Sequence, residues 1–171
     1  VSREQVVALA AAGVTVSLGH SNATFDEARS YAAAGASMVT HLFNAMSQIG
    51  NREPGLSGAA IANPALFAGI IADGIHVDPA TMDIAFRAKR GPGRIVLVTD
   101  AMATIGTDMT EFTLNGRTVH RRDGRLTLED GTLAGADLDM VSAVRFMHRV
   151  IGLELGEALR MASRYPAQVL G

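Results

Sequence analysis

The stretch that decides the fold of this chain is Ile95-Val96-Leu97-Val98-Thr99-Asp100. Its continuous apolar run has neither the spacing of a helix nor the alternation of a half-exposed strand, so it predicts a strand buried on both faces. Strands of this kind belong to parallel sheets that helices cover. Asp100 then stands at the carboxyl end of a buried strand, where parallel α/β proteins place their functional groups.

Similar strands precede this stretch, each followed by a helical segment or a long loop. We predict strands at 14–19, 36–40 and 66–72, a long loop at 42–54, and helices at 24–34 and 78–90. Thr24 and Glu27 have the spacing of a capping box. Asp78 and Pro79 supply an N-cap and a first-turn proline. Four strand-helix units of roughly 30 residues therefore predict an α/β protein built from βα repeats.

The pattern changes after residue 100. We predict short antiparallel strands and then two closing helices, at 112–114, 118–120, 125–128, 139–151 and 155–164. Asn115-Gly116 and Asp123-Gly124 separate the strands and are typical of hairpin turns. The second closing helix should stop before Pro166, because helical backbone is disfavoured before a proline.

The length of the chain limits how much of a barrel it can form. Its 171 residues fall short of the roughly 250 residues of a complete (β/α)₈ barrel. No linker or low-complexity segment divides it, so we expect one structural unit over residues 1–171. The first residue is Val1 rather than Met, and we expect that sequence upstream of it is missing.

Composition excludes several classes of function. The net charge is −2 and the 15 Lys and Arg residues are scattered, so neither nucleic acid nor a membrane is an expected partner. There is no Cys, so any metal must be held by His and carboxylate groups. No apolar run approaches the roughly 20 residues of a membrane span. These features are compatible with a cytoplasmic protein, which is our expectation.

The ends of the predicted strands carry a repeated kind of residue. His20, His41, the Asp73/His76 pair and Asp100 each follow a strand. A lone His in such a place is most often structural, but four consecutive strand ends of this kind indicate a shared site. Two imidazoles and a carboxylate bind a divalent metal with a position left for water. An Asp nearby could take a proton from that water and deliver it to a leaving group.

The loop after His41 contains a second candidate group. Asn44, Arg52 and several glycines supply amide and guanidinium donors and a permissive backbone. Arg binds carboxylate or phosphate through paired hydrogen bonds. Alternatively, Arg52 is a solvated surface charge or caps the Glu53-Pro54 turn, and spacing does not choose between these readings.

Several short motifs together carry a family resemblance. They are Gly19-His20-Ser21, Thr40-His41-Leu42-Phe43-Asn44-Ala45-Met46, Arg52-Glu53-Pro54-Gly55, Ala72-Asp73-Gly74-Ile75-His76-Val77 and Val98-Thr99-Asp100-Ala101. In this order and spacing the chain resembles the N-acetylglucosamine-6-phosphate deacetylases of the amidohydrolase superfamily. The resemblance implies the last four βα units of a TIM-like (β/α)₈ metal-dependent hydrolase barrel, the C-terminal portion of that domain, with the upstream strands missing.

The resemblance also implies a reaction and roles for residues. The reaction removes acetate from N-acetylglucosamine 6-phosphate, in a protein that forms a homodimer. His20 and His41 match the metal ligands, and Asp100 matches the catalytic acid/base. The implied substrate contacts are Asn44, Ala45, Arg52 and His76, the last two directed at the phosphate. The metal would be divalent: Zn²⁺ suits the ligands, with Fe²⁺, Co²⁺ and Mn²⁺ as alternatives.

The chain departs from the family pattern in some places. The third metal ligand of the family is a Glu upstream of Val1, and no residue here replaces it. Ala136, Asp137 and Asp139 replace the family's usual residues beside the site, and Ser47 follows Met46 where Pro is common.

Two alternatives follow from these observations. The substrate could be a related amide such as N-acetylgalactosamine 6-phosphate, because both sugars require the same groups. The isolated chain could also be an inactive fragment that binds metal poorly, because it lacks the carboxylate ligand and the first strands.

Overall fold

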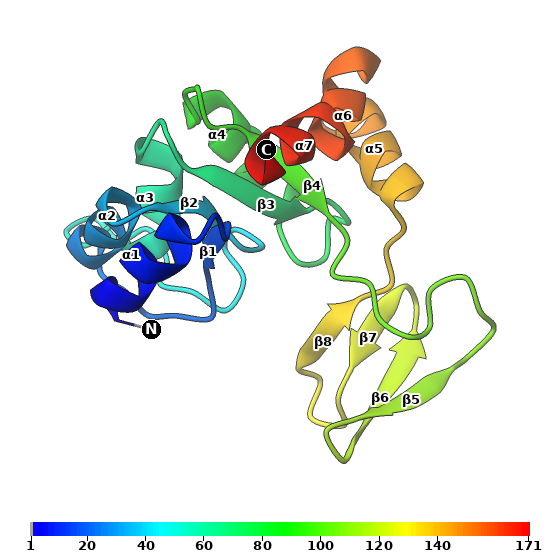
Figure 1. Ribbon diagram of the computed structural model, residues 1–171. Coiled ribbons are helices and arrows are strands. Elements are labelled where there is room, and N and C mark those ends of the chain that lie inside the picture. The colour runs from blue at the N-terminus through cyan, green and yellow to red at the C-terminus, as the bar shows by residue number, and fades with distance from the viewer. Residues whose placement is uncertain (1) are drawn as a thin grey trace.

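The computed structural model describes residues 2–171, and the expectation that concerned Val1 lies outside them. Four parallel strands form the central sheet in the order β1-β2-β3-β4 (Figure 1). They are β1 (Val16–Leu18), β2 (Ala36–Val39), β3 (Phe67–Ile71) and β4 (Ile95–Val98). Each strand pairs with the next one along the chain. The predicted α/β class with four βα units is therefore confirmed, and all four strand positions agree with the sequence to within a few residues.

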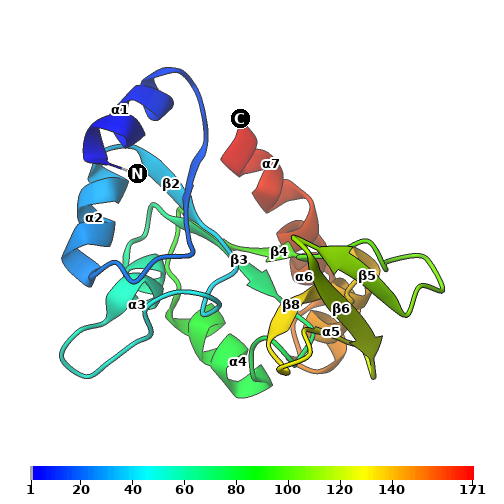
Figure 2. The same cartoon turned by 90° about the horizontal axis from the view of Figure 1, so that it is seen from below.

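Helices connect and cover the strands. They are α1 (Arg3–Ala11), α2 (Phe25–Ala33), α3 (Gly55–Ala62), α4 (Pro79–Ala88), α5 (Met140–Arg149), α6 (Leu155–Ala162) and α7 (Arg164–Leu170). Helices α5, α6 and α7 contact β4, whereas α2 and α3 contact β2 and β3 respectively (Figure 2). The Thr15 hydroxyl donates to the Val169 carbonyl at 3.2 Å. This bond joins the segment before β1 to the last helix of the chain.

The predicted helix starts are formed as the sequence indicates. The Glu27 N–H donates to Thr24 Oγ1 at 3.2 Å, and the Thr24 N–H donates to Glu27 Oε2 at 2.8 Å. The Ala80 N–H donates to the Asp78 carboxylate at 2.8 Å. Each bond satisfies an N–H group that the first turn of a helix leaves without an intrahelical partner.

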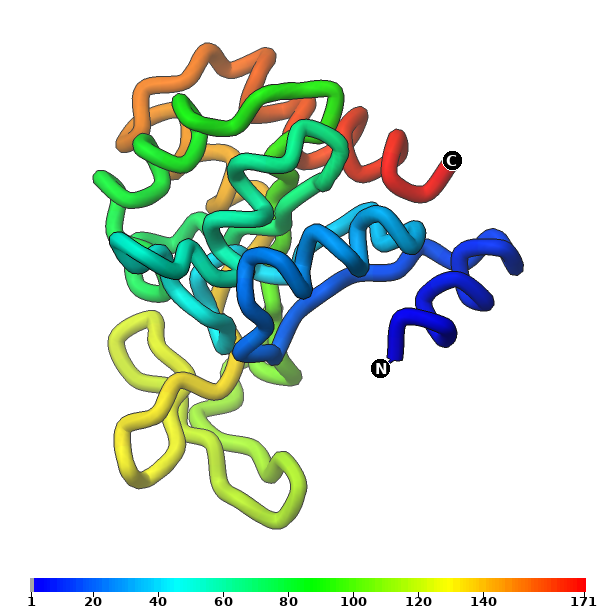
Figure 3. Tube along the Cα trace, turned by 90° about the vertical axis from the view of Figure 1, so that its left-hand side faces the viewer, coloured from blue at the N-terminus to red at the C-terminus, as the bar shows by residue number. Residues whose placement is uncertain are grey.

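A second sheet is antiparallel and stands to one side of the parallel sheet (Figures 1 and 3). Its order is β5-β6-β7-β8, with β5 (Glu111–Leu114), β6 (Arg117–Arg122), β7 (Arg125–Thr127) and β8 (Leu133–Ala136). Asn115-Gly116 and Asp123-Gly124 adopt positive φ at both positions, as two-residue hairpin turns require. The predicted excursion is confirmed. The sequence did not predict β8, which is short and contains Gly135.

Two helical regions differ from the prediction. Helix α3 follows the long loop directly and was not predicted. The closing segment does not stop at Pro166: it breaks at Ser163 and continues as α7. Pro166 lies in the first turn of α7, where its missing N–H removes no intrahelical bond.

The main core lies between the parallel sheet and its helices. The largest fully buried side chains include Leu42, Leu56, Ile70, Met82 and Met161. They contribute to a single cluster that also takes in residues of α5 and β8. Among residues 2–171, no helix is long and apolar enough to cross a bilayer.

Candidate metal and active site

Sharp backbone turns follow three of the four parallel strands. His20, His41 and Asp100 each come two residues after β1, β2 and β4, with φ values of 45°, 23° and 50°. Positive φ is uncommon for residues other than glycine and costs energy. Such strain persists where the surrounding structure enforces it, often at functional sites. The strained positions coincide with the strand-end residues that the sequence nominated.

His20 and His41 meet directly. Their Nε2 atoms are 2.9 Å apart, and their rings lie edge to face with centroids 4.8 Å apart. His41 is buried and His20 is exposed. Strands β1 and β2 are adjacent, so their carboxyl ends bring the two side chains to the same point.

This pair fits part of a metal site. Two imidazole nitrogens bound to one tetrahedral Zn²⁺ are roughly 3.3 Å apart, given Zn–N bonds of about 2.0–2.1 Å. The observed separation is close to that value. His41 Nδ1 is buried and has no hydrogen-bond partner within residues 2–171, although ligating histidines usually donate from their second nitrogen. In the same residues, no three His, Asp or Glu side chains gather in an arrangement that could hold a metal.

Asp100 lies further along the same edge of the sheet. Strand β3 separates β4 from β2, so the backbones at Asp100 and His41 are roughly 10 Å apart. The Asp100 carbonyl accepts a hydrogen bond from the Ala136 N–H at 2.8 Å, which fixes the backbone. Its exposed carboxylate has no hydrogen-bond partner in the described chain, so both oxygens are available to a ligand or a water molecule.

Asp73 and His76 form a separate pair in the loop between β3 and α4. His76 Nδ1 lies 2.6 Å from Asp73 Oδ2, and the two side chains are only 7% and 9% exposed. Asp73 Oδ1 accepts the N–H groups of Ile75 and His76 at 2.8 and 2.9 Å. Burial alone would raise the pKa of Asp73, but the hydrogen bonds from the His76 side chain and the two backbone groups hold it below its usual value.

The loop from Leu42 to Pro54 carries the other candidate residues. Asn44 Nδ2 donates to the Leu42 carbonyl at 3.3 Å. Ala45 is exposed, has a φ of 49°, and its carbonyl accepts the Ser21 N–H at 3.1 Å. The loop therefore joins the residue after His20 to the residues after His41.

Arg52 does not cap the turn that follows it. Glu53 performs this role: its Oε1 atom accepts the N–H groups of Phe25 at 2.7 Å and Gly55 at 3.0 Å. Arg52 is exposed and makes no hydrogen bond or ion pair with any described residue. The capping interpretation is wrong, whereas solvation and anion binding both agree with this position.

Ser47 is a structural residue whose role the sequence did not reveal. Its hydroxyl donates to the Ala23 carbonyl at 2.6 Å and accepts the Leu56 N–H at 2.8 Å. Gln48 Nε2 donates to the carbonyls of Phe43 and Met46, both at 2.8 Å. The Ser47 bonds join the loop to the segment before α2 and to the start of α3, and the Gln48 bonds join residues within the loop. Ser47 stood out in the sequence only as a departure from the family pattern, and neither residue lies in a local pattern that predicts these hydrogen bonds.

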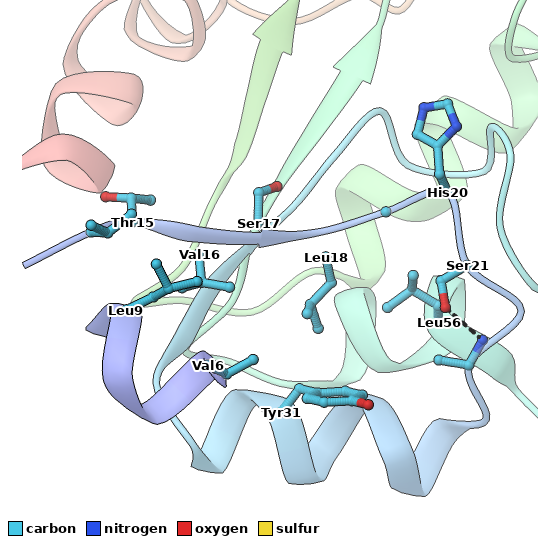
Figure 4. A pocket seen from close by; sticks show the side chains of 13 residues that line it. Val6, Leu9, Thr15, Val16, Ser17, Leu18, His20, Ser21, Tyr31 and Leu56 are labelled. Carbon is cyan, nitrogen blue, oxygen red and sulfur yellow. Dashed lines mark hydrogen bonds between the residues drawn. The ribbon is translucent and has the colours of Figure 1, made fainter. Parts of the chain in front are cut away.

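A groove of about 570 Å³ runs along β1 beside the site (Figure 4). Val6, Val16, Leu18 and Tyr31 contribute apolar parts of its wall, and Thr15, Ser17 and Ser21 contribute polar groups. His20 lies at one end, with its ring turned away from these side chains. Within residues 2–171, no strand pairs with the outer edge of β1.

The known proteins described below that are similar to this chain are all named as deacetylases. No family model matches the chain. An N-acetylgalactosamine-6-phosphate deacetylase of Shewanella sp. (strain ANA-3) is 45% identical over 99% of this chain, and the match covers 43% of that protein. An N-acetylglucosamine-6-phosphate deacetylase of Lysinibacillus sphaericus is 39% identical over 96% of this chain and 42% of its own length.

Solved structures agree in fold. The N-acetylglucosamine-6-phosphate deacetylase from Pasteurella multocida matches with a TM-score of 0.94 and 39% identity, over 99% of this chain and 44% of that one. A mutant of the Mycobacterium smegmatis enzyme, solved in complex with N-acetyl-D-glucosamine-6-phosphate, matches with a TM-score of 0.89, 34% identity and coverage of 99% and 45%. The chain thus spans less than half the length of the relatives it matches.

Proposed function

The chain is homologous to N-acetylglucosamine-6-phosphate deacetylases over nearly its whole length, and from this we propose that the protein hydrolyses the N-acetyl group of N-acetylglucosamine 6-phosphate. The products are acetate and glucosamine 6-phosphate. The observation that carries the proposal is the position of His20 and His41. Their Nε2 atoms lie 2.9 Å apart, at the carboxyl ends of two adjacent strands. Imidazole nitrogens that converge in this way can hold a hydrolytic divalent metal.

His20 and His41 would hold a divalent metal, for which Zn²⁺ suits the ligands and Fe²⁺, Co²⁺ and Mn²⁺ are alternatives. A metal bound there would polarise the amide carbonyl and make hydroxide available near neutral pH. A third ligand, a carboxylate, would come from sequence outside this chain, because residues 2–171 place no acidic side chain with the pair. His41 Nδ1 is buried without a partner within residues 2–171, so a complete site would also need a group that accepts its hydrogen bond.

Asp100 is the proposed acid/base. Its carboxylate has no competing hydrogen bond from the described chain, and its backbone is fixed by the bond to Ala136. It would accept the proton from the attacking water and deliver it to the departing amine nitrogen. The amine needs this proton because an unprotonated amide nitrogen is a poor leaving group.

The loop after β2 and the loop after β3 would bind the sugar phosphate. Arg52 is the proposed phosphate ligand, because its guanidinium is exposed, unpaired within the described chain, and suited to paired hydrogen bonds. Asn44, Ala45 and His76 are the other proposed substrate contacts, and His76 is directed at the phosphate together with Arg52. A homodimer, which the resemblance implies, is part of the same proposal.

The edges of the sheet support the proposed barrel. Strand β1 pairs with β2 and β4 pairs with β3, and in the described residues each has a free outer edge. Unpaired edges of a parallel sheet expose backbone donors and acceptors. We infer that further strands close these edges, which makes this chain the last four βα units of a (β/α)₈ barrel.

N-acetylgalactosamine 6-phosphate is the second candidate substrate. The observation that favours it is the 45% identity with the Shewanella enzyme, against 39% with the Lysinibacillus enzyme. The two sugars differ at one hydroxyl group, so the metal pair, Asp100 and Arg52 would serve both.

Acetate release by the protein encoded in the complete reading frame tests the proposal. We expect turnover of one of the two sugar phosphates, loss of turnover on chelation, and a fall of at least 100-fold for Asp100→Asn, in line with general acid/base contributions. The isolated 171-residue chain is expected to be inactive. Turnover by Asp100→Asn close to wild type would refute the role of Asp100, and no acetate from either sugar would refute the function.

A further inference from the structure

Arg121 joins the antiparallel sheet to the loop that follows Asp100. It lies in β6, and its backbone N–H donates to the Thr110 carbonyl at 2.7 Å. In its side chain, Nη1 donates to the Thr107 carbonyl at 2.7 Å, and Nε donates to Asp137 Oδ2 at 2.7 Å. One side chain therefore contacts both the loop after Asp100 and the segment directly after β8.

Asp137 depends on this contact. Its side chain is only 8% exposed, and its Oδ1 atom is buried without a partner among residues 2–171. Within the described chain, the Arg121 guanidinium is thus the group that compensates the charge of this carboxylate. A carboxylate removed from water needs such a partner, because an unpaired buried charge is strongly destabilising. Arg121 therefore sets the position of Asp137.

The segment next to Asp137 in turn holds the backbone of Asp100. The Ala136 N–H donates to the Asp100 carbonyl at 2.8 Å, and Ala136 pairs with Ala101 in a parallel bridge. Gly135 allows this close approach: it adopts a φ of 79°, and a Cβ there would lie 3.0 Å from the Asp100 carbonyl oxygen. Asp100 itself has a φ of 50°, a strained conformation that persists only where surrounding contacts enforce it.

We propose that Arg121 and Asp137 are a positioning pair, whose ion pair holds the end of β8 against Asp100 and thereby aims the Asp100 carboxylate at the reacting atoms. The catalytic consequence rests on the proposed function, whereas the placement of the Asp100 backbone does not. Another ion pair of the same sheet, Arg117–Asp130, provides a comparison. Its side chains are 61% and 60% exposed and 3.3 Å apart, and exposed pairs of this kind contribute little.

Replacing both members of the pair separates position from stability. Arg121→Met alone would leave the Asp137 charge unpaired and would destabilise the fold for that reason. In Arg121→Met/Asp137→Leu both charges are absent and the side-chain shapes are nearly kept, a change that buried ion pairs often tolerate without loss of stability. Arg117→Met/Asp130→Leu is the matched control. Arg121→Lys is a further variant, because it keeps the positive charge but replaces two bonding nitrogens with one ammonium group.

Hydrogen exchange of the Ala136 amide in the whole protein measures whether Asp100 is held, because this N–H is bound to the Asp100 carbonyl. We expect exchange to accelerate roughly 10-fold in Arg121→Met/Asp137→Leu, within the range of coupling between residues of one hydrogen-bond network. Arg121→Lys should change the rate in the same direction, and the control pair should leave it unchanged. An Ala136 amide that exchanges as slowly in Arg121→Met/Asp137→Leu as in the wild type would overturn the proposal. Should that variant not fold, Arg121→Lys is judged by the same criterion.

Kinetics of acetate release tests the catalytic consequence. We expect kcat to fall about 10- to 100-fold in Arg121→Met/Asp137→Leu, because a reacting group displaced by about 1 Å loses this much. KM should stay close to the wild-type value, since the proposed phosphate ligands lie on the loops after β2 and β3. Asp137→Asn should retain most of kcat, because its amide oxygen still accepts the Arg121 Nε–H.

Three kinetic results would count against the proposal or its premise. A rise in KM without a fall in kcat would contradict a positioning role, and so would an equal loss of kcat in the control variant. Absence of turnover by the wild type would refute the proposed function, while the exchange rate of Ala136 would still decide whether the pair holds Asp100.

Discussion

Replacing Gly69 with alanine tests how tightly the sheet supports the metal pair. Gly69 is buried in β3, and its carbonyl accepts the Leu42 N–H at 2.6 Å, next to His41. An added Cβ would lie 3.1 Å from Val98 Cγ1 and 3.3 Å from the backbone nitrogen of His41. Both separations are shorter than ordinary contacts. The Val98 side chain can rotate, but the backbone of His41 can move only with the strained turn that holds its ring.

We expect Gly69→Ala to lower the free energy of unfolding. Overpacking of this kind costs about 1–3 kcal/mol. Alanine recovers about 0.4–1 kcal/mol through the lower entropy of the unfolded chain. The middle of each range gives a net loss of about 1.3 kcal/mol for Gly69→Ala. Gly156→Ala is the matched control, because Gly156 lies in α6 with only the flexible end of Arg160 nearby, at 3.4 Å. It should gain about 0.5–1 kcal/mol from helix propensity.

Urea unfolding of the two variants measures these opposite signs. We expect the urea concentration at the midpoint to fall for Gly69→Ala and to rise for Gly156→Ala. The dependence of the unfolding free energy on urea concentration should stay the same in both variants. The metal affinity of the whole protein should fall for Gly69→Ala alone, because His41 is displaced. A Gly69→Ala chain as stable as the wild type would show that the sheet yields beneath His41, and that the turn does not fix the ligand.

Two further predictions concern charged side chains. Arg52→Ala should raise KM for the phosphorylated sugar about 10- to 150-fold, the value of a charge-assisted hydrogen bond, with little change in KM for the unphosphorylated sugar. The control is Arg90→Ala, at another exposed arginine without a partner in the described chain, which should change neither KM. Equal increases in KM for both sugars in Arg52→Ala would exclude a phosphate contact. Burial, followed by the positive charge of Arg94, lowers the pKa of Lys89 from 10.5 to about 8. Between these two values the unfolded chain binds more protons than the folded chain, so stability should increase as the pH rises from about 8 to 10.5. Urea unfolding across this range should show the increase in the wild type and lose it in Lys89→Met; the same rise in Lys89→Met would assign it to another group.

The sequence predicted those parts of the fold that depend on local patterns. The apolar run at 95–98 became β4, the Thr24/Glu27 spacing became a capping box, and Asn115-Gly116 became a hairpin turn. In each case the residues within a few positions determine the outcome. The site followed in part for the same reason, because consecutive βα units place their strand ends side by side.

Other features depend on packing between distant segments, which no local pattern encodes. Helix α3 has glycines at 55 and 58 and no side-chain cap, yet most of its residues are buried against neighbouring elements. Helix α7 tolerates Pro166 because the preceding break at Ser163 places the proline in a first turn. The hydrogen bonds of Ser47 cannot be predicted from a local pattern either, since they join the loop to Ala23 and Leu56.

We have proposed that His20 and His41 together hold a divalent metal. The most direct test of this proposal is the metal content of the whole protein after dialysis, measured for His20→Ala and His41→Ala with His120→Ala and His148→Ala as controls. His120 lies in the antiparallel sheet and His148 on an exposed part of α5, away from the pair. We expect stoichiometric metal in the wild type and in both controls, and loss of the metal from His20→Ala and from His41→Ala. Stoichiometric metal in His20→Ala or His41→Ala would contradict the proposal.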